Sequence, residues 1–194
     1  MKSWLFIVIA ALASCDPPPD PGLREAALRG YIEAVNRNAV SEALAFHTPD
    51  AEFQIPGQGT IQGLEAMRSL LQWDSVLGSR IRFEPLNWRG DTLVVSAGAE
   101  RNAWFAGIGV DSIQYTAGTR FVFEGDRIRG VYPASLEPES LVELEARFGA
   151  FWRWAETNAP EAARLAPEGL FQYNAEAAQE WLDIFARYQD EGGF

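Results

Sequence analysis

The sequence predicts an α+β fold in which an antiparallel sheet packs against N-terminal helices and a C-terminal helical extension follows. Three changes of pattern support this prediction. Apolar residues recur at helical spacing between Leu23 and Phe46, the spacing changes to two at Arg80, and helical spacing returns after Pro133. A sheet with this alternation packs one face on a core and leaves the other face in water.

Residues 1–14 have the features of a secretory signal peptide. Lys2, the only lysine of the chain, precedes an apolar run from Trp4 to Leu12, and Ala13 and Ser14 follow. A positive start, a short apolar stretch and small residues before the cleavage point define such a signal. A helix that spans a bilayer needs about 20 apolar residues, so this run is too short to be one.

The tetrapeptide Leu12-Ala13-Ser14-Cys15 resembles the lipobox of bacterial lipoproteins, whose cysteine receives a diacylglycerol and whose new amino terminus is acylated. Cys15 is the only cysteine and has no disulfide partner in the chain, which favours lipidation. The resemblance implies that lipid on Cys15 attaches the protein to a membrane of the bacterial cell envelope, inner or outer. Residues 15–22 then form a proline-rich tether, extended over roughly 20 Å.

Residues 23–133 are predicted to form one domain. We expect one or two helices up to Phe46, then a short strand at 51–55, a Pro-Gly turn and a helix at 64–73. Four long strands in a meander follow, separated by glycine-containing turns; their ranges are 80–88, 92–105, 111–124 and 127–132. The alternation within the third strand places Arg120 on the outer face and these residues on the inner face: Ile113, Tyr115, Ala117, Thr119, Phe121 and Phe123.

Residues 134–194 are predicted to form the helical extension. One helix carries an apolar stripe, and a second helix starts at an Asn174 cap with its own stripe; together the stripes comprise Leu141, Leu144, Phe148, Phe151, Trp152, Trp181, Ile184, Phe185 and Tyr188. An exposed apolar surface of this size is unusual on a monomer. We expect the helices to pack against each other and the domain; the alternatives are a lid over a cavity or a docking surface for a protein partner.

The order of elements, together with TPDAEF at 48–53 and GTIQGLEAMR at 59–68, resembles the SnoaL-like branch of the nuclear transport factor 2-like superfamily. The resemblance covers about residues 24–133. It implies a cone-shaped, strongly curved sheet that wraps the N-terminal helices. The superfamily contains polyketide cyclases, ketosteroid isomerases, epoxide hydrolases and non-enzymatic binding domains, so the resemblance predicts the fold more firmly than the activity.

The residues of ketosteroid isomerases can be compared with this sequence position by position. Their phenolic oxyanion donor falls on Tyr31, but their general base falls on Ile55 and their second, acidic donor on Thr119. Because isoleucine cannot transfer a proton, we expect no isomerase activity from these positions. The same positions should line the interior of the cone, which gives a predicted ligand-binding set of Tyr31, Ile55, Tyr115, Thr119 and Phe121; the alternative is that these side chains only fill the core.

Other ionisable residues suggest little chemistry. His47 is the only histidine and supports neither a metal site nor a catalytic triad, so a structural role is expected. Only one of Glu100 and Arg101 can point inward, because they are neighbours on a strand, and a solvated charge is the preferred interpretation of both. The formal net charge of −11 argues against a nucleic-acid partner, so none is expected. No motif indicates a cofactor or a metal.

These observations favour a lipid-anchored, non-catalytic domain that binds a small hydrophobic ligand or a protein partner, which includes a second copy of the chain. The first alternative is a cyclase-, isomerase- or hydrolase-type enzyme acting on a small apolar substrate. The second is a pure interaction module that uses the C-terminal helices. An open cavity that holds a buried carboxyl group with a raised pKa would favour the enzyme.

Overall fold

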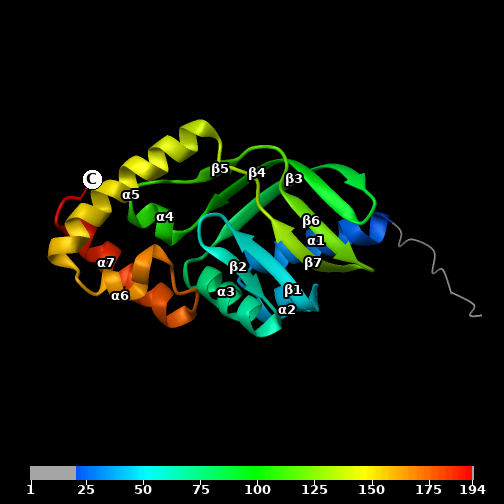
Figure 1. The fold of residues 1–194 in the computed structure, drawn as a ribbon, viewed down its shortest axis with the longest axis horizontal. Coiled ribbons are helices and arrows are strands. Elements are labelled where there is room, and N and C mark those ends of the chain that lie inside the picture. The colour runs from blue at the N-terminus through cyan, green and yellow to red at the C-terminus, as the bar shows by residue number, and fades with distance from the viewer. Residues whose placement is uncertain (1–20, 194) are drawn as a thin grey trace, which may run out of the picture.

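The computed structural model describes residues 21–193 and forms a curved sheet with helices on its concave side and at one end (Figure 1). The predicted signal peptide, Cys15 and most of the predicted tether lie outside the described residues. Among residues 21–193, no helix is both long enough and apolar enough to cross a membrane.

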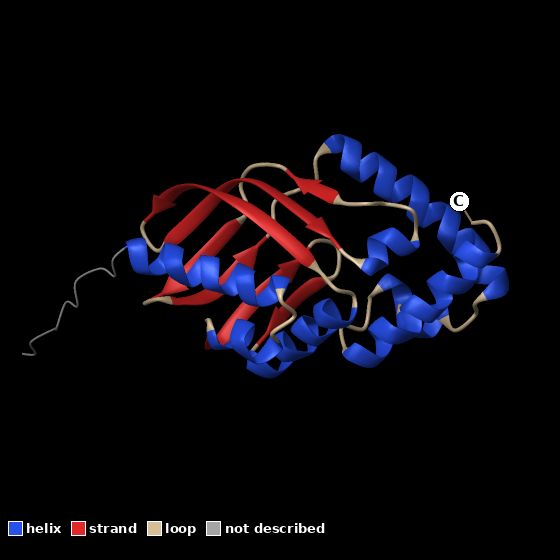
Figure 2. Cartoon of the chain, turned by 180° about the vertical axis from the view of Figure 1, so that it is seen from behind, coloured by secondary structure: helices blue, strands red, loops and turns tan. Residues whose placement is uncertain are grey.

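The N-terminal half begins with α1 (Pro21–Asn36) and α2 (Val40–Ala45), followed by the hairpin of β1 (His47–Ile55) and β2 (Gly59–Gln62). Helix α3 (Leu64–Val76) comes next. Figure 2 shows α1 lying across the concave face of the sheet. Residues at helical spacing on α1 and α3 face the sheet and are buried there, among them Leu28, Tyr31, Val35, Met67 and Leu71.

The meander consists of β3 (Arg80–Arg89), β4 (Thr92–Arg101), β5 (Ile113–Tyr115), β6 (Arg120–Glu124) and β7 (Arg127–Tyr132). The strand order is β2-β1-β7-β6-β4-β3, and β5 pairs with β4 beside β6. All pairs are antiparallel except β1 with β7, which run parallel with Phe53 opposite Val131. The predicted curved, mainly antiparallel sheet is therefore confirmed.

Two of the predicted long strands are interrupted. The strand predicted for 92–105 ends at Arg101, because Asn102 caps the short helix α4 (Ala103–Gly107) by accepting a hydrogen bond from the Phe105 amide at 3.0 Å. The strand predicted for 111–124 breaks at Gly118, whose φ of 117° L-residues rarely adopt. The break leaves Ala117 exposed, whereas the other five residues predicted to face inward are buried or half-buried.

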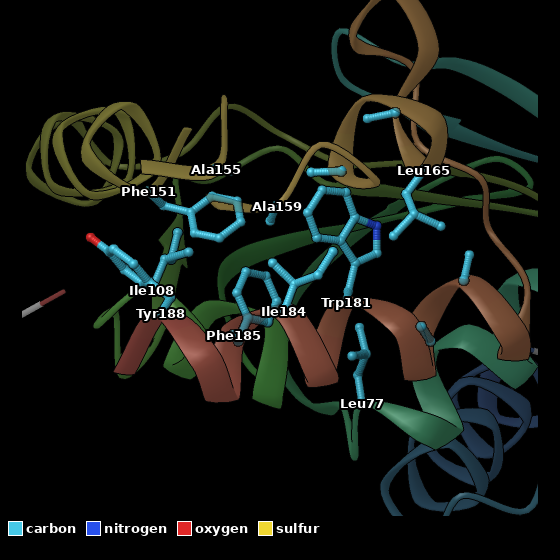
Figure 3. Packing of buried hydrophobic residues seen from close by; sticks show 14 of the residues in the cluster. Leu77, Ile108, Phe151, Ala155, Ala159, Leu165, Trp181, Ile184, Phe185 and Tyr188 are labelled. Atoms are coloured by element: carbon cyan, nitrogen blue, oxygen red, sulfur yellow. The ribbon is translucent and has the colours of Figure 1, made fainter. Parts of the chain in front are cut away.

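The C-terminal extension contains α5 (Pro138–Asn158), α6 (Ala162–Leu165), a single 3-10 turn at Pro167–Gly169 and α7 (Ala175–Asp190). Asn174 caps α7 as predicted, since its side chain accepts a hydrogen bond from the Ala177 amide at 2.8 Å. The two long helices pack through Phe151 on one side and Phe185 and Tyr188 on the other (Figure 3).

The extension also packs on the domain. Its buried residues form one cluster with side chains that precede it in the chain, namely Trp73, Leu77, Ile108, Val110 and Ile113. A second cluster fills the space between the sheet and helices α1 to α3. We call these the C-terminal core and the domain core. The expectation that the helices cover each other and the domain matches this packing.

Candidate functional site

A cavity of about 580 Å³ lies where the two cores meet. Its walls come from α1, α3, the inner face of the sheet, α4 and the C-terminal extension. Exposed lining residues, including Pro56, Ser135 and Leu141, mark its mouth. The volume lies within the range of small-molecule sites, and most of the lining is apolar or aromatic.

All five side chains predicted to bind a ligand lie on the wall of this cavity: Tyr31, Ile55, Tyr115, Thr119 and Phe121. Tyr31 and Tyr115 contribute phenol groups. Thr119 is fully buried, and its hydroxyl accepts a hydrogen bond from the Ala134 amide at 2.9 Å, so this oxygen is occupied in holding the chain after β7. Ligand binding by these five residues stays a prediction.

Two carboxyl groups from different elements line the cavity. Asp74 comes from the last turn of α3, and Glu100 from the end of β4. Glu100 accepts hydrogen bonds from the Tyr115 hydroxyl at 2.9 Å and from the Asn102 amide at 3.1 Å. The preferred interpretation of Glu100 as a solvated strand charge was therefore wrong: the side chain points inward, and its neighbour Arg101 is the exposed one.

Small polar residues join the two carboxyl groups. The Ser79 hydroxyl donates to Asp74 Oδ1 at 3.2 Å, and the Asn102 amide that binds Glu100 also lies 3.4 Å from Ser79 Oγ. Asn102 is itself fixed as the cap of α4. The change from strand to helix at this residue thus sets the position of Glu100.

The surroundings of the two carboxyl groups disfavour charge. Burial, and then repulsion from Glu100, raise the pKa of Asp74 to about 8. Burial also raises the pKa of Glu100, although its two hydrogen bonds act in the opposite direction and favour the ionised form. Asp74 is therefore mainly protonated at pH 7, and we assign the negative charge of the pair to Glu100, which has more donors.

Phenol groups complete the polar end of the cavity. Tyr31 and Tyr173 both line it, and burial, followed by the charges of Asp74 and then Glu100, raises the pKa of each phenol. Burial also raises the pKa of Tyr115, which Glu100 binds directly. Within residues 21–193 the cavity lining contains no Arg, Lys or His side chain. The polar end is therefore acidic and rich in hydroxyl groups.

Other residues singled out in the sequence lie elsewhere. His47 is buried at the start of β1, where its Nδ1 lies 3.1 Å from the Ala43 carbonyl oxygen and its ring packs edge-on against Tyr31. These contacts agree with a structural role. Arg120 points outward as predicted and lies over the ring of Tyr132. No group of His, Cys, Asp and Glu residues in the described part of the chain could hold a metal ion.

Comparison with known proteins decides the family. The model of the SnoaL-like domain matches residues 28–131, just over half of the chain. The chain belongs to the SnoaL-like family. The match begins within α1 and contains α2 to β6 and nearly all of β7, so the C-terminal extension lies outside this SnoaL-like domain. Comparison with curated proteins gave no match.

Solved structures share the nuclear transport factor 2-like fold of this SnoaL-like domain. The epoxide hydrolase/cyclase-like enzyme SalBIII, described with a role in pyran ring formation in the polyether salinomycin, is 16% identical with a TM-score of 0.54. That alignment covers 62% of this chain and 95% of SalBIII. A nuclear transport factor 2-like protein from Burkholderia xenovorans LB400 is 17% identical with a TM-score of 0.50, over 64% of this chain and 97% of its own. Similarity at these levels shows the fold alone.

Two members of the site were missed in the sequence. Asp74 lies four residues after Leu70 and seven after Met67, so it continues the buried stripe of α3, and a charged residue on a buried stripe was the available signal. Tyr173 gave no such signal. It lies in the loop before α7, in the C-terminal extension, and its place beside the SnoaL-like domain depends on contacts between residues far apart in the sequence.

Proposed function

We propose that this protein is an acid–base enzyme that acts on a small, largely apolar substrate inside the cavity. The observation that carries the proposal is the pairing of Asp74 and Glu100, two carboxyl groups with raised pKa values, in an aromatic cavity open to solvent. Perturbed carboxyl groups that converge in a pocket are typical of active sites.

The two carboxyl groups are suited to different roles. Glu100, stabilised as a carboxylate by Tyr115 and Asn102, acts as the general base that accepts a proton from the substrate or from water. Asp74, protonated at neutral pH, acts as the general acid that donates a proton to a substrate oxygen. A base and an acid held in one apolar site can open an epoxide, close a ring or move a double bond.

A purely passive binding domain accounts less well for this arrangement. Placing two carboxyl groups near each other in an apolar cavity opposes their ionisation, and a binding site for a neutral apolar ligand has no need of them. An interaction module that uses the C-terminal helices leaves the carboxyl pair unexplained. Phe151 of α5 and the large apolar side chains of α7 are buried within the chain, although Leu141 and Val142 of α5 remain exposed.

The proposal is tested with a panel of small apolar epoxides and β,γ-unsaturated ketones, with product formation followed by mass spectrometry and chiral chromatography. Asp74→Asn and Glu100→Gln should each lower turnover by about 10²-fold or more, because each removes one proton-transfer group. Glu65→Gln and Glu84→Gln, which change exposed carboxyl groups on α3 and β3, should leave turnover unchanged.

Turnover that survives Asp74→Asn and Glu100→Gln would contradict the assignment of both residues. The unsaturated ketones also test whether a new base replaces the one that isomerases use, because Ile55 and Thr119 offer no proton-transfer group at the isomerase positions. If wild-type protein isomerises the ketone and Glu100→Gln does not, Glu100 is that base.

We also propose that the protein is a lipoprotein of the bacterial cell envelope, with lipid on Cys15. The support is the Leu12-Ala13-Ser14-Cys15 motif after an apolar segment, together with the lone cysteine. Two or three acyl chains give stable membrane attachment where a single chain is marginal.

Cys15→Ala should therefore leave the precursor uncleaved or release the protein to the soluble fraction. Membrane fractionation and mass spectrometry of the N-terminal peptide measure both outcomes, with Ser3→Ala as the control. A wild-type protein that is soluble and carries an unmodified thiol would refute the proposal.

A further inference from the structure

A loop of the C-terminal extension is tied to the β1–β2 turn at the mouth of the cavity. The side-chain amide of Gln58 donates to the Gly169 carbonyl oxygen at 2.9 Å, and the Phe171 amide donates to Gln58 Oε1 at 2.8 Å. Both ends of the Gln58 amide are thus used on one five-residue segment, Gly169 to Tyr173. We call this segment the clasped loop.

The clasped loop supplies part of the cavity wall. Phe171 and Tyr173 line the cavity from a segment outside the SnoaL-like match, and the ring of Tyr173 packs edge-on against Trp73, with centroids 5.4 Å apart. Trp73 directly precedes Asp74 on α3. The contact therefore holds the Tyr173 phenol beside the carboxyl pair.

Two phenol groups at this end of the cavity have unused hydrogen-bonding capacity. Tyr31 is only 5% exposed and Tyr173 is half-buried, and within residues 21–193 neither hydroxyl has a hydrogen-bond partner. The third phenol, Tyr115, differs because it is already bound to Glu100. Tyr31 belongs to the family domain, whereas Tyr173 belongs to the extension.

From this geometry we infer that Tyr173 is a substrate-contacting residue supplied by the C-terminal extension, which donates a hydrogen bond, together with Tyr31, to a neutral oxygen acceptor of the substrate. The inference rests on the proposed function for its chemistry, but it concerns binding alone. The ligand class is a compact apolar molecule with a carbonyl or ether oxygen at one end. Gln58 positions Tyr173 by fixing the clasped loop.

Two probes of matched shape test this inference by equilibrium binding. 2-Acetylnaphthalene carries a carbonyl oxygen, and 2-ethylnaphthalene has the same bicyclic ring and chain length without it. Wild-type protein should bind the ketone more tightly. Tyr173→Phe should weaken ketone binding about 3- to 10-fold, as expected for loss of one hydrogen bond, and leave binding of the hydrocarbon within about 2-fold.

An infrared measurement separates contact from packing. The carbonyl stretch of bound 2-acetylnaphthalene should lie at lower frequency than in hexane, and part of that shift should disappear in Tyr173→Phe. Tyr132→Phe is the control, since the Tyr132 hydroxyl donates to Glu52 outside the cavity lining. Gln58→Ala should weaken the binding of both probes, because the clasped loop loses its hydrogen bonds to Gln58. Gln54→Ala, a change at an exposed residue of β1, should leave binding unchanged.

If Tyr173→Phe weakens binding of both probes equally and leaves the carbonyl frequency unchanged, Tyr173 only packs against the ligand, and the inference is overturned. Failure of wild-type protein to prefer the ketone would overturn it as well. Absence of turnover in the substrate panel leaves these binding results unaffected, so the inference and the proposed function fail separately.

Discussion

His47 is enclosed between α2 and the sheet, where a positive charge would be poorly solvated. The imidazole is 1% exposed, and burial lowers its pKa to about 4. In the unfolded chain a histidine titrates near 6.5. Between these two values the unfolded state binds more protons than the folded state, so the contribution of His47 to stability is complete above pH 6.5 and is lost as the pH falls towards 4.

We therefore predict that acid weakens the fold through His47. The free energy of unfolding of His47→Phe, relative to wild type, should rise by about 2–3 kcal/mol between pH 6.5 and pH 4, because phenylalanine keeps the ring contact with Tyr31 and cannot be protonated. Urea unfolding at several pH values measures this difference. A difference that stays constant across the range would contradict the prediction.

The carboxyl pair has the opposite dependence on pH. The folded pKa of Asp74 is raised to about 8, so its neutral form is compatible with the fold, and stability declines as the pH rises from about 4 towards 8. The free energy of unfolding of Asp74→Asn, relative to wild type, should therefore rise as the pH increases from about 4 to 8. The corresponding difference for His47→Phe changes in the opposite direction, because it rises as the pH falls below 6.5.

At the scale of elements, close packing between helices makes some glycines irreplaceable and others not. A methyl group on Gly107 of α4 would overlap the ring of Phe185 on α7. On Gly149 of α5 the nearest atom to such a methyl group is Arg153 Nη1 at 3.5 Å, an ordinary contact with a flexible side chain.

Gly107→Ala should therefore destabilise the protein by about 1–3 kcal/mol through overpacking. Gly149→Ala should stabilise it by about 0.5–1 kcal/mol, because alanine favours the helix interior. Chemical denaturation of both variants measures the two effects. Equal effects in both would indicate that α4 and α7 do not pack as described.

Elements whose ends are set by contacts between residues close in the sequence could be predicted, and the others could not. The α7 start was predictable because Asn174 forms its cap with residues of its own helix. The end of the second meander strand and the break within the third were not predictable, because apolar alternation continues through both interruptions. Only the Asn102 cap and the backbone of Gly118 break the strands there.

The site divides in the same way. The five predicted wall residues followed from the alternation between residues 113 and 123 and from the family pattern on α1 and β1. Glu100 was visible but misjudged, because the sequence could not show that Asn102 and Tyr115 would hold it inward. Tyr173 depends on long-range packing that no local pattern encodes.

At the scale of the whole molecule, the C-terminal core joins the extension to the SnoaL-like domain. Truncation after Pro133 would expose side chains that the extension now buries, including Trp73, Leu77 and Ile108. Each fully buried large apolar side chain contributes roughly 1.5–3 kcal/mol. A chain ending at Pro133 should therefore aggregate or unfold at a lower temperature than the full chain.

Size-exclusion chromatography and thermal unfolding of both chains test this expectation. A truncated chain that is monomeric and as heat-stable as the full chain would show that the extension is an independent module. In that case the docking of a protein partner on α5 and α7 would become the better explanation of their apolar residues.

Because residues of both cores line the cavity, a ligand that fills it contacts both of them. Its binding energy then adds to the resistance of the whole chain to unfolding, by about 2.7 kcal/mol at a concentration one hundred times the dissociation constant. Melting temperature thus becomes a readout that requires no knowledge of the reaction. Metabolite extracts can be sorted by the heat tolerance they confer before any substrate has been guessed.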